Sequence, residues 1–174
     1  FALMLKYFFF IFFLIIITNA KADNKSKIIE NLNQTENLTF IFEQNINGKI
    51  DNGKCVIKYP KKIFCEYSKK QNKILVSNGK SLVIKTRTGY FRYPLKKTAL
   101  NFILDKNFLI NKIYDLEERI SDKSYINYTI MENDNEINIF FDKKTFNLIG
   151  WQTKDIYQNL NVTFLSSVKK NQII

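Results

Sequence analysis

The chain has 174 residues, enough for one domain, and its 45% hydrophobic and 25% charged residues are typical of a folded globular protein. It has no histidine and two cysteines, which excludes histidine-based catalysis, His-ligated metals and four-cysteine zinc sites. The net charge of +11 comes from 24 lysines and three arginines, beside 25 isoleucines and 21 asparagines, as an AT-rich genome would produce. We therefore expect no metal, no cofactor and no nucleic-acid partner.

Residues 1–22 have the pattern of a secretory signal peptide. Met4 and Lys6 precede an unbroken apolar run over residues 7–17, which is too short to cross a bilayer. Ala20 and Ala22 form an A-x-A cleavage site, so we expect a single mature domain over residues 23–174 in the periplasm. An uncleaved membrane anchor is the alternative.

The mature chain begins with a predicted helix over residues 25–35, with Ser26 as its N-cap, and then changes to a period of two. Asn47-Gly48, Asn52-Gly53 and Asn78-Gly79 are predicted turns. The apolar segment 98–105 predicts a second short helix. Strands are predicted over residues 38–43, 53–59, 63–67, 73–77, 80–85, 89–93, 112–120, 125–131, 136–141, 148–154 and 159–166.

Many short strands with close turns indicate a strongly bent antiparallel sheet or a barrel. The apolar helix over residues 98–105 must bury most of its surface. It either fills the barrel as core or lies across an open mouth as a lid over an apolar cavity. Its spacing leaves both arrangements open.

Four segments in register resemble the LolA family of periplasmic outer-membrane lipoprotein carriers, especially its alphaproteobacterial branch. They are Phe42-Glu43-Gln44, residues 53–67, Ile74 to Leu82 and Tyr93 to Leu104. The resemblance implies a mainly β fold with an α lid, namely a half-open antiparallel β-barrel enclosing an apolar cavity. It also implies a monomeric, non-enzymatic carrier of triacylated lipoproteins from an inner-membrane ABC transporter to the outer membrane, with an acceptor there where one exists.

Strand alternation selects the candidate residues of the acyl-chain cavity, although core packing explains each of them equally well. From the strands they are Leu38, Phe40, Phe42, Cys55, Ile57, Tyr59, Ile63, Cys65, Tyr67, Val76, Leu82 and Ile84. From the lid they are Leu100, Phe102, Ile103 and Leu104. The single tryptophan, Trp151, is assigned to the core.

Two departures from the family pattern stand out. The resemblance implies an arginine that hydrogen-bonds the lid backbone at the position of Tyr59, and a phenol offers one donor where a guanidinium offers five. Lys58 or Lys61 is the alternative donor to the lid. The family pattern also implies a further short terminal segment after Ile174.

A hairpin centred on Pro60 pairs position 58 with 62, 57 with 63, and Cys55 with Cys65. The two cysteines then point to the same side at a separation that a disulfide tolerates. We expect a Cys55–Cys65 disulfide in the oxidising periplasm, the alternative being two small buried apolar side chains.

Three other functions remain open. One is a LolA-fold lipid-binding or envelope-stress sensor module without a shuttle role. Another is a basic nucleic-acid-binding barrel, and a third is a hydrolase using Glu43, Glu66 or Asp155, although no partner residue pairs them. The acceptor LolB shares the implied fold but needs a cysteine at the cleavage site, where Ala22-Asp23 stands.

Overall fold

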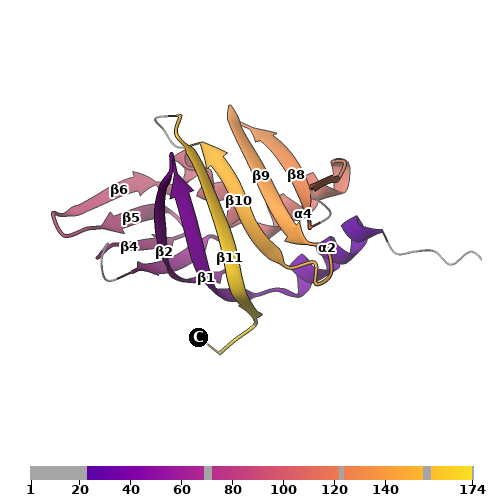
Figure 1. The fold of residues 1–174 in the computed structure, drawn as a ribbon, viewed down its shortest axis with the longest axis horizontal. Helices are drawn as coiled ribbons and strands as arrows, with labels where there is room; N and C mark the ends of the chain where they lie inside the picture. The colour runs from indigo at the N-terminus through magenta and orange to yellow at the C-terminus, as the bar shows by residue number, and fades with distance from the viewer. Residues whose placement is uncertain (1–22, 69–71, 122–123, 155–157, 174) are drawn as a thin grey trace, which may run out of the picture.

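The computed structural model describes residues 23–68, 72–121, 124–154 and 158–173. The predicted signal peptide, Asp155 and the terminal Ile174 lie outside the described residues. The helical elements, labelled as in Figure 1, are α2 (Asn24–Gln34), η1 (Leu95–Lys97), α3 (Leu100–Ile103) and α4 (Lys106–Asp115). The strands are β1 (Asn37–Ile46), β2 (Lys49–Lys58), β3 (Lys62–Tyr67), β4 (Ile74–Asn78), β5 (Ser81–Lys85), β6 (Tyr90–Pro94), β7 (Arg119–Ser121), β8 (Tyr125–Glu132), β9 (Asn135–Asp142), β10 (Leu148–Lys154) and β11 (Leu160–Lys170).

In the described part of the chain, eleven strands form one antiparallel sheet in the order β6-β5-β4-β3-β2-β1-β11-β10-β9-β8-β7. Two meanders, β1 to β6 and β7 to β11, join where β11 pairs with β1. Strands β6 and β7 remain as edges, so the sheet is open rather than closed on itself. The predicted half-open antiparallel architecture is confirmed.

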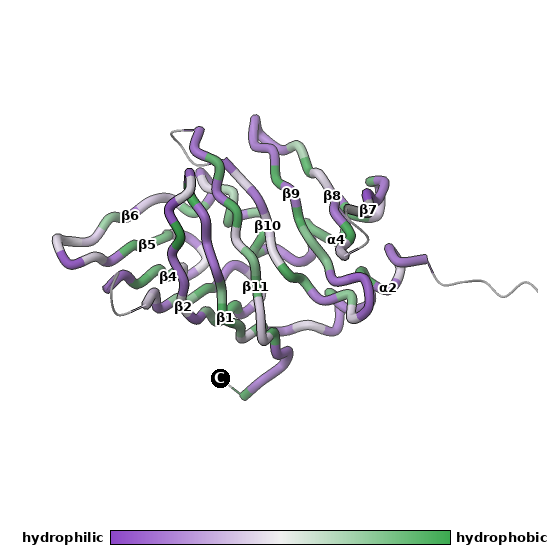
Figure 2. Tube along the Cα trace, viewed as in Figure 1, coloured by the Kyte–Doolittle hydropathy of each residue, from purple (hydrophilic) through white to green (hydrophobic). Residues whose placement is uncertain are grey.

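The segment between the two edges, from η1 to α4, lies against one face of the sheet together with α2 (Figure 1). Ile28 of α2 and Ile113 of α4 are fully buried in one core cluster with Ile126, Tyr128 and Ile139 from β8 and β9. Helices α2 and α4 therefore pack against the β7–β10 half of the sheet and occupy the space in front of it. Along many of the strands, hydrophobic and hydrophilic residues alternate, as Figure 2 shows, because successive side chains point to opposite faces.

The predicted strand over residues 112–120 is wrong, because residues 112–115 belong to α4 and the strand begins only at Arg119. Asp105 caps this helix: its carboxylate accepts a hydrogen bond from the Phe108 N–H at 3.1 Å. Leu109 and Ile113, four residues apart, are both fully buried. A cap and a buried helical face therefore outweigh the weak alternation, and the strand is confined to β7.

Two smaller predictions also fail. Asp23 rather than Ser26 occupies the N-cap position of α2, without a side-chain capping bond. Asn52-Gly53 is not a turn but lies inside β2, where a Cβ on Gly53 would clash with the backbone of β3 and the ring of Phe42. The other two turns are confirmed: Asn47-Gly48 joins β1 to β2, and the Asn78 side chain accepts hydrogen bonds from the N–H groups of Lys80 and Ser81.

Candidate functional site

The strands β1 to β5 enclose a cavity of about 500 Å³ beneath η1 and α3. Eight of the predicted strand residues line it: Phe40, Phe42, Cys55, Ile63, Cys65, Tyr67, Leu82 and Ile84. Leu100 and Ile103 line it from α3. The short apolar helix therefore covers a hollow.

Four other predicted residues belong to the core and do not line the cavity. Leu38, Ile57 and Leu104 are buried in the cluster that includes the helices, with exposed fractions of 3%, 0% and 0%. The ring of Phe102 packs against that of Phe108, with 5.0 Å between their centroids. Leu38 pairs with Ile57, and the next inward pair along the same strands, Phe40 and Cys55, faces the cavity.

The prediction for Val76 is wrong. Its side chain is 37% exposed, and its partners in the neighbouring strands are Phe64 and Val83 on the outer face. Leu75, which pairs with Ile84, faces the cavity instead. The structure pairs 77 with 82 and 75 with 84, so the hairpin is centred on Gly79-Lys80. A turn centred on Asn78-Gly79 would shift these pairs by two residues but would also place Leu75, not Val76, on the face of Leu82 and Ile84.

The sequence analysis also missed several lining residues. Trp151 of β10 is 6% exposed and belongs to the core cluster, but it lines the cavity too. Tyr93 of β6 lines it from the edge of the sheet. Because Trp151 is the chain's single tryptophan, it is a natural fluorescence reporter of the cavity.

The Cys55–Cys65 register is confirmed. Cys55 lies directly opposite Cys65 in the β2–β3 pair, and the structure joins the two Sγ atoms in a disulfide. Both side chains are buried, at 4% and 5% exposure, in the wall of the cavity. This bridge fastens the two strands directly beneath the lid.

The lid is held by the turn between β2 and β3. The Lys61 backbone N–H donates to the carbonyl of Leu104 at 2.7 Å, and the Lys61 ammonium lies 3.2 Å from the Asp105 carboxylate. The Tyr59 hydroxyl is buried and has no hydrogen-bond partner among the described residues, and burial raises its pKa above the usual range. Lys61, and not the Tyr59 hydroxyl, therefore makes the contact between this turn and the lid.

Polar groups ring one end of the cavity. The Tyr67 hydroxyl donates to the Gln44 side-chain carbonyl at 3.0 Å. The Lys73 ammonium nitrogen lies 3.7 Å from the Tyr67 ring centroid and 2.9 Å from a carboxylate oxygen of Asp51. Burial and the nearby Asp51 charge raise the pKa of Tyr67 above its usual range, so it remains a donor. An apolar interior with a polar rim suits an amphiphile, whose head and tail have opposite solvation.

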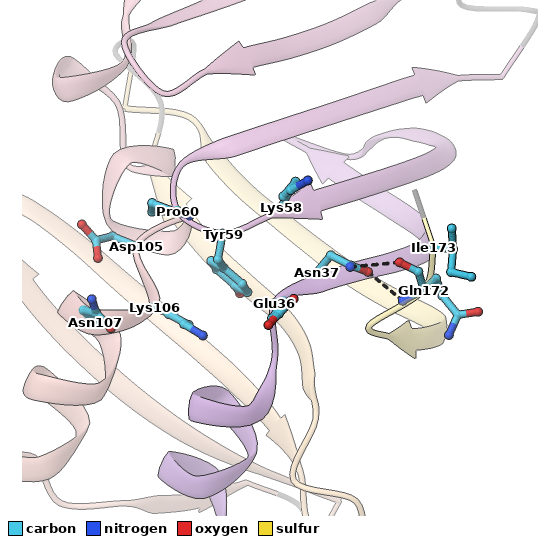
Figure 3. A pocket seen from close by; sticks show the side chains of 10 residues that line it. All are labelled: Glu36, Asn37, Lys58, Tyr59, Pro60, Asp105, Lys106, Asn107, Gln172 and Ile173. Carbon is cyan, nitrogen blue, oxygen red and sulfur yellow. Dashed lines mark hydrogen bonds between the residues drawn. The ribbon is translucent and has the colours of Figure 1, made fainter.

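A second hollow, of about 530 Å³, lies at the Tyr59-Pro60 turn (Figure 3). Tyr59 lines this hollow and not the cavity beneath α3, so its assignment to the cavity is wrong. Its lining is largely polar: Glu36, Asn37, Lys106 and Gln172 surround it, and two hydrogen bonds join Asn37 to Gln172. The Lys106 ammonium donates to carbonyls at the C-terminal end of α2 and so ties α4 to α2. The cavity beneath α3 has a larger apolar lining than this second hollow, and it is therefore the better candidate for the functional site.

Among the described residues, the carboxylates considered for a hydrolase do not come together, and there is no cluster of metal ligands. The carboxylates of Glu43 and Glu66 are exposed on strands separated by β2, and no three Cys, Asp or Glu residues come together as metal ligands. No helix among the described residues is long and apolar enough to span a membrane.

The model of one protein family, described as outer membrane lipoprotein carrier protein LolA, matches residues 33–174. No curated protein matches. An uncharacterized conserved protein from Thermus thermophilus has a similar fold, with a TM-score of 0.51, 8% identity and coverage of 87% of this chain and 90% of that one. A LolA superfamily protein from Nitrosomonas europaea aligns at a TM-score of 0.41, with 8% identity and coverage of 88% and 96%. The lipoprotein LppX of Mycobacterium tuberculosis aligns at 0.45, with 9% identity and coverage of 86% and 95%.

Proposed function

Since the chain belongs to the LolA family, we propose that it is a periplasmic carrier that binds the acyl chains of lipoproteins in the cavity beneath α3. It receives them from an inner-membrane ABC transporter and delivers them to the outer membrane. The observation that carries this proposal is the apolar hollow of about 500 Å³ in the open half of the sheet. The exposed, unpaired positions of Glu43 and Glu66 favour a binding protein over an enzyme.

The volume of the cavity limits how much lipid the closed form holds. A methylene group is about the size of a water molecule, whose share of liquid volume is roughly 30 Å³. A cavity of about 500 Å³ therefore accommodates about one chain of about 16 carbons. A triacylated lipoprotein requires α3 to move outward, or leaves part of its chains at the cavity mouth.

The free energy of exposing acyl chains to water also indicates that the carrier covers the chains only partly. Three chains of about 16 carbons, at about 0.8 kcal/mol per CH₂, represent roughly 40 kcal/mol of exposure to water. Noncovalent affinities saturate near about 20 kcal/mol. The carrier therefore exchanges one apolar environment for another, and the energy for loading comes from the transporter, because the sequence contains no nucleotide-binding motif.

Two measurements test the proposal. The protein is purified from periplasm and examined by mass spectrometry for bound triacyl lipopeptide, and Trp151 fluorescence is titrated with a synthetic triacyl lipopeptide. We expect saturable binding, with no change for the same peptide without acyl chains. Absence of lipopeptide in both measurements would refute the proposal.

The second candidate is a lipid-binding or sensor module without a shuttle role, which the same apolar cavity supports. A transfer assay separates the two. A carrier moves labelled lipoprotein from inner-membrane vesicles to acceptor vesicles at a rate that grows with its concentration. A sensor module binds the lipopeptide but leaves the transfer rate unchanged.

A further inference from the structure

The segment from Ile74 to Leu104 is basic throughout. It contains Lys80, Lys85, Arg87, Arg92, Lys96 and Lys97 and no acidic residue, whereas residues 105–142 contain nine. All six cations are exposed. Two of the three arginines of this lysine-rich chain lie within it, at the β5–β6 hairpin. Arginine binds phosphate oxygens bidentately, which lysine does not.

The same hairpin exposes aromatic rings. Tyr90 is 73% exposed, Phe91 52% and Tyr93 37%, and every residue of β6 is exposed. Five residue pairs join β6 to β5, and the tip is closed by a hydrogen bond from the Thr86 N–H to the Gly89 carbonyl at 2.7 Å. In Figure 1 this hairpin reaches the end of the molecule away from α2. The rings are therefore presented on a folded projection.

The inner face of the hairpin continues the apolar lining of the cavity. Phe91 pairs with Ile84 and Tyr93 with Leu82, and three of these four residues line the cavity. An uninterrupted apolar surface thus runs from beneath α3 to Phe91 near the tip. An acyl chain that follows this surface stays in contact with apolar side chains until it leaves the protein.

We propose that the β5–β6 hairpin docks on an anionic phospholipid bilayer, with Tyr90 and Phe91 in the interface and the surrounding Lys and Arg residues against the phosphates. Amphipathic aromatic rings favour the boundary between headgroups and acyl chains, and juxtaposed cations add attraction to anionic lipid. Docking in this way brings the mouth of the cavity to the membrane. The purpose of the docking rests on the proposed function, but the docking itself does not.

The structure favours a lipid surface over an added β-strand from a protein partner. Strand β6 is an open edge, but Pro94 lacks an N–H and Arg92 places a charge on the edge strand. Both features oppose strand addition. Continuity with the apolar cavity in turn favours lipid over an acidic protein.

Co-flotation with vesicles tests the proposal. We expect the lipid-free protein to float with phosphatidylglycerol–phosphatidylethanolamine vesicles, to dissociate at high salt and not to bind phosphatidylcholine vesicles. Tyr90→Ser with Phe91→Ser weakens binding about tenfold or more. Lys85→Gln with Arg92→Gln weakens it roughly thirtyfold, because each cation near an anionic surface contributes about a fivefold factor.

Matched controls lie on the other half of the molecule. Tyr114→Ser removes a ring that is 72% exposed on α4, and Lys143→Gln with Lys144→Gln removes two exposed cations from the β9–β10 turn. Both variants are expected to float like the wild type. Wild-type protein that fails to float, or hairpin variants that float like these controls, would overturn the proposal. So would equal binding to soluble polyglutamate that is unaffected by the aromatic substitutions, since that result indicates an acidic polypeptide partner.

Lipopeptide titration keeps the two proposals apart. The variant Lys85→Gln with Arg92→Gln should bind triacyl lipopeptide with wild-type affinity by Trp151 fluorescence, because neither side chain lines the cavity. Wild-type protein that floats with vesicles but binds no lipopeptide would refute the carrier function and leave the docking surface standing.

Discussion

The backbone N–H of Lys61 donates a hydrogen bond to the carbonyl oxygen of Leu104 at 2.7 Å, joining the β2–β3 turn to the end of α3. The Lys61–Asp105 ion pair reinforces this contact with side chains that are 32% and 26% exposed. A backbone hydrogen bond cannot be removed by changing a side chain, so most of this lid contact is independent of the residue type at position 61. The ion pair is the adjustable part.

Lys61→Met should loosen the lid without unfolding the domain. The loss is about 0.2–1 kcal/mol, because the pair is partly solvated. Asp105→Ser should have the same effect, since serine keeps the cap of α4, whereas Asp105→Ala should cost about 1 kcal/mol more. Unfolding in denaturant measures these values. Additive effects of Lys61→Met and Asp105→Ser in a double-mutant cycle would show that the pair contributes nothing.

Leu100→Asp should abolish lipopeptide binding in a folded protein. Leu100 is half-buried at the cavity, so a carboxylate there reaches water in the free protein and must be desolvated when an acyl chain enters. Trp151 fluorescence titration measures the affinity. Wild-type affinity in this variant would contradict the role of α3 as a lid.

Phe102→Asp is the contrasting substitution on the same helix. Phe102 is 8% exposed and packs on Phe108, so its loss should cost at least about 3–5 kcal/mol of folding free energy. Chemical denaturation should show this loss directly. A Phe102→Asp protein as stable as Leu100→Asp would mean that the ring is not part of the core.

The mature protein should be isolated with Cys55 and Cys65 oxidised. Non-reducing mass spectrometry should give a mass two hydrogens below that of the dithiol, and no alkylation under denaturing conditions. Cys55→Ser with Cys65→Ser should lower the free energy of unfolding by about 2–3 kcal/mol, because the bridge closes a short loop in the unfolded chain. Alkylation of both thiols would refute the disulfide.

Asp142 should make the domain sensitive to acid. Hydrogen bonds from the Thr145 and Lys144 N–H groups hold the pKa of Asp142 below its usual range. A carboxyl whose folded pKa lies below its unfolded value stabilises the protein above the unfolded pKa, and this contribution disappears as pH falls through the folded pKa. Asp142→Asn should therefore reduce the loss of stability below about pH 4. If the free energy of unfolding of Asp142→Asn falls with decreasing pH as steeply as that of the wild type, Asp142 does not have this role.

Local pattern predicted most strands and the β2–β3 register, because a turn at Pro60 and a period of two leave one consistent pairing. It failed at α4, where Leu109, Ile113 and Leu116 have the spacing of a helix and Asp105 caps its first turn. It also could not separate Leu38 and Ile57 from Phe40 and Cys55, whose patterns are equivalent. That distinction depends on where helices distant in sequence come to rest.

The pairing of β11 with β1 has a consequence for how the domain is made. Strand β11, the last strand of the described residues, lies in the middle of the sheet and joins the cavity half to the helix-filled half. Until it is present, β1 and β10 are additional open edges, which are templates for aggregation. The domain therefore cannot complete its sheet until β11 has been synthesised and exported. A chain that stops before residue 160 leaves two half-sheets with open edges that other chains can pair with.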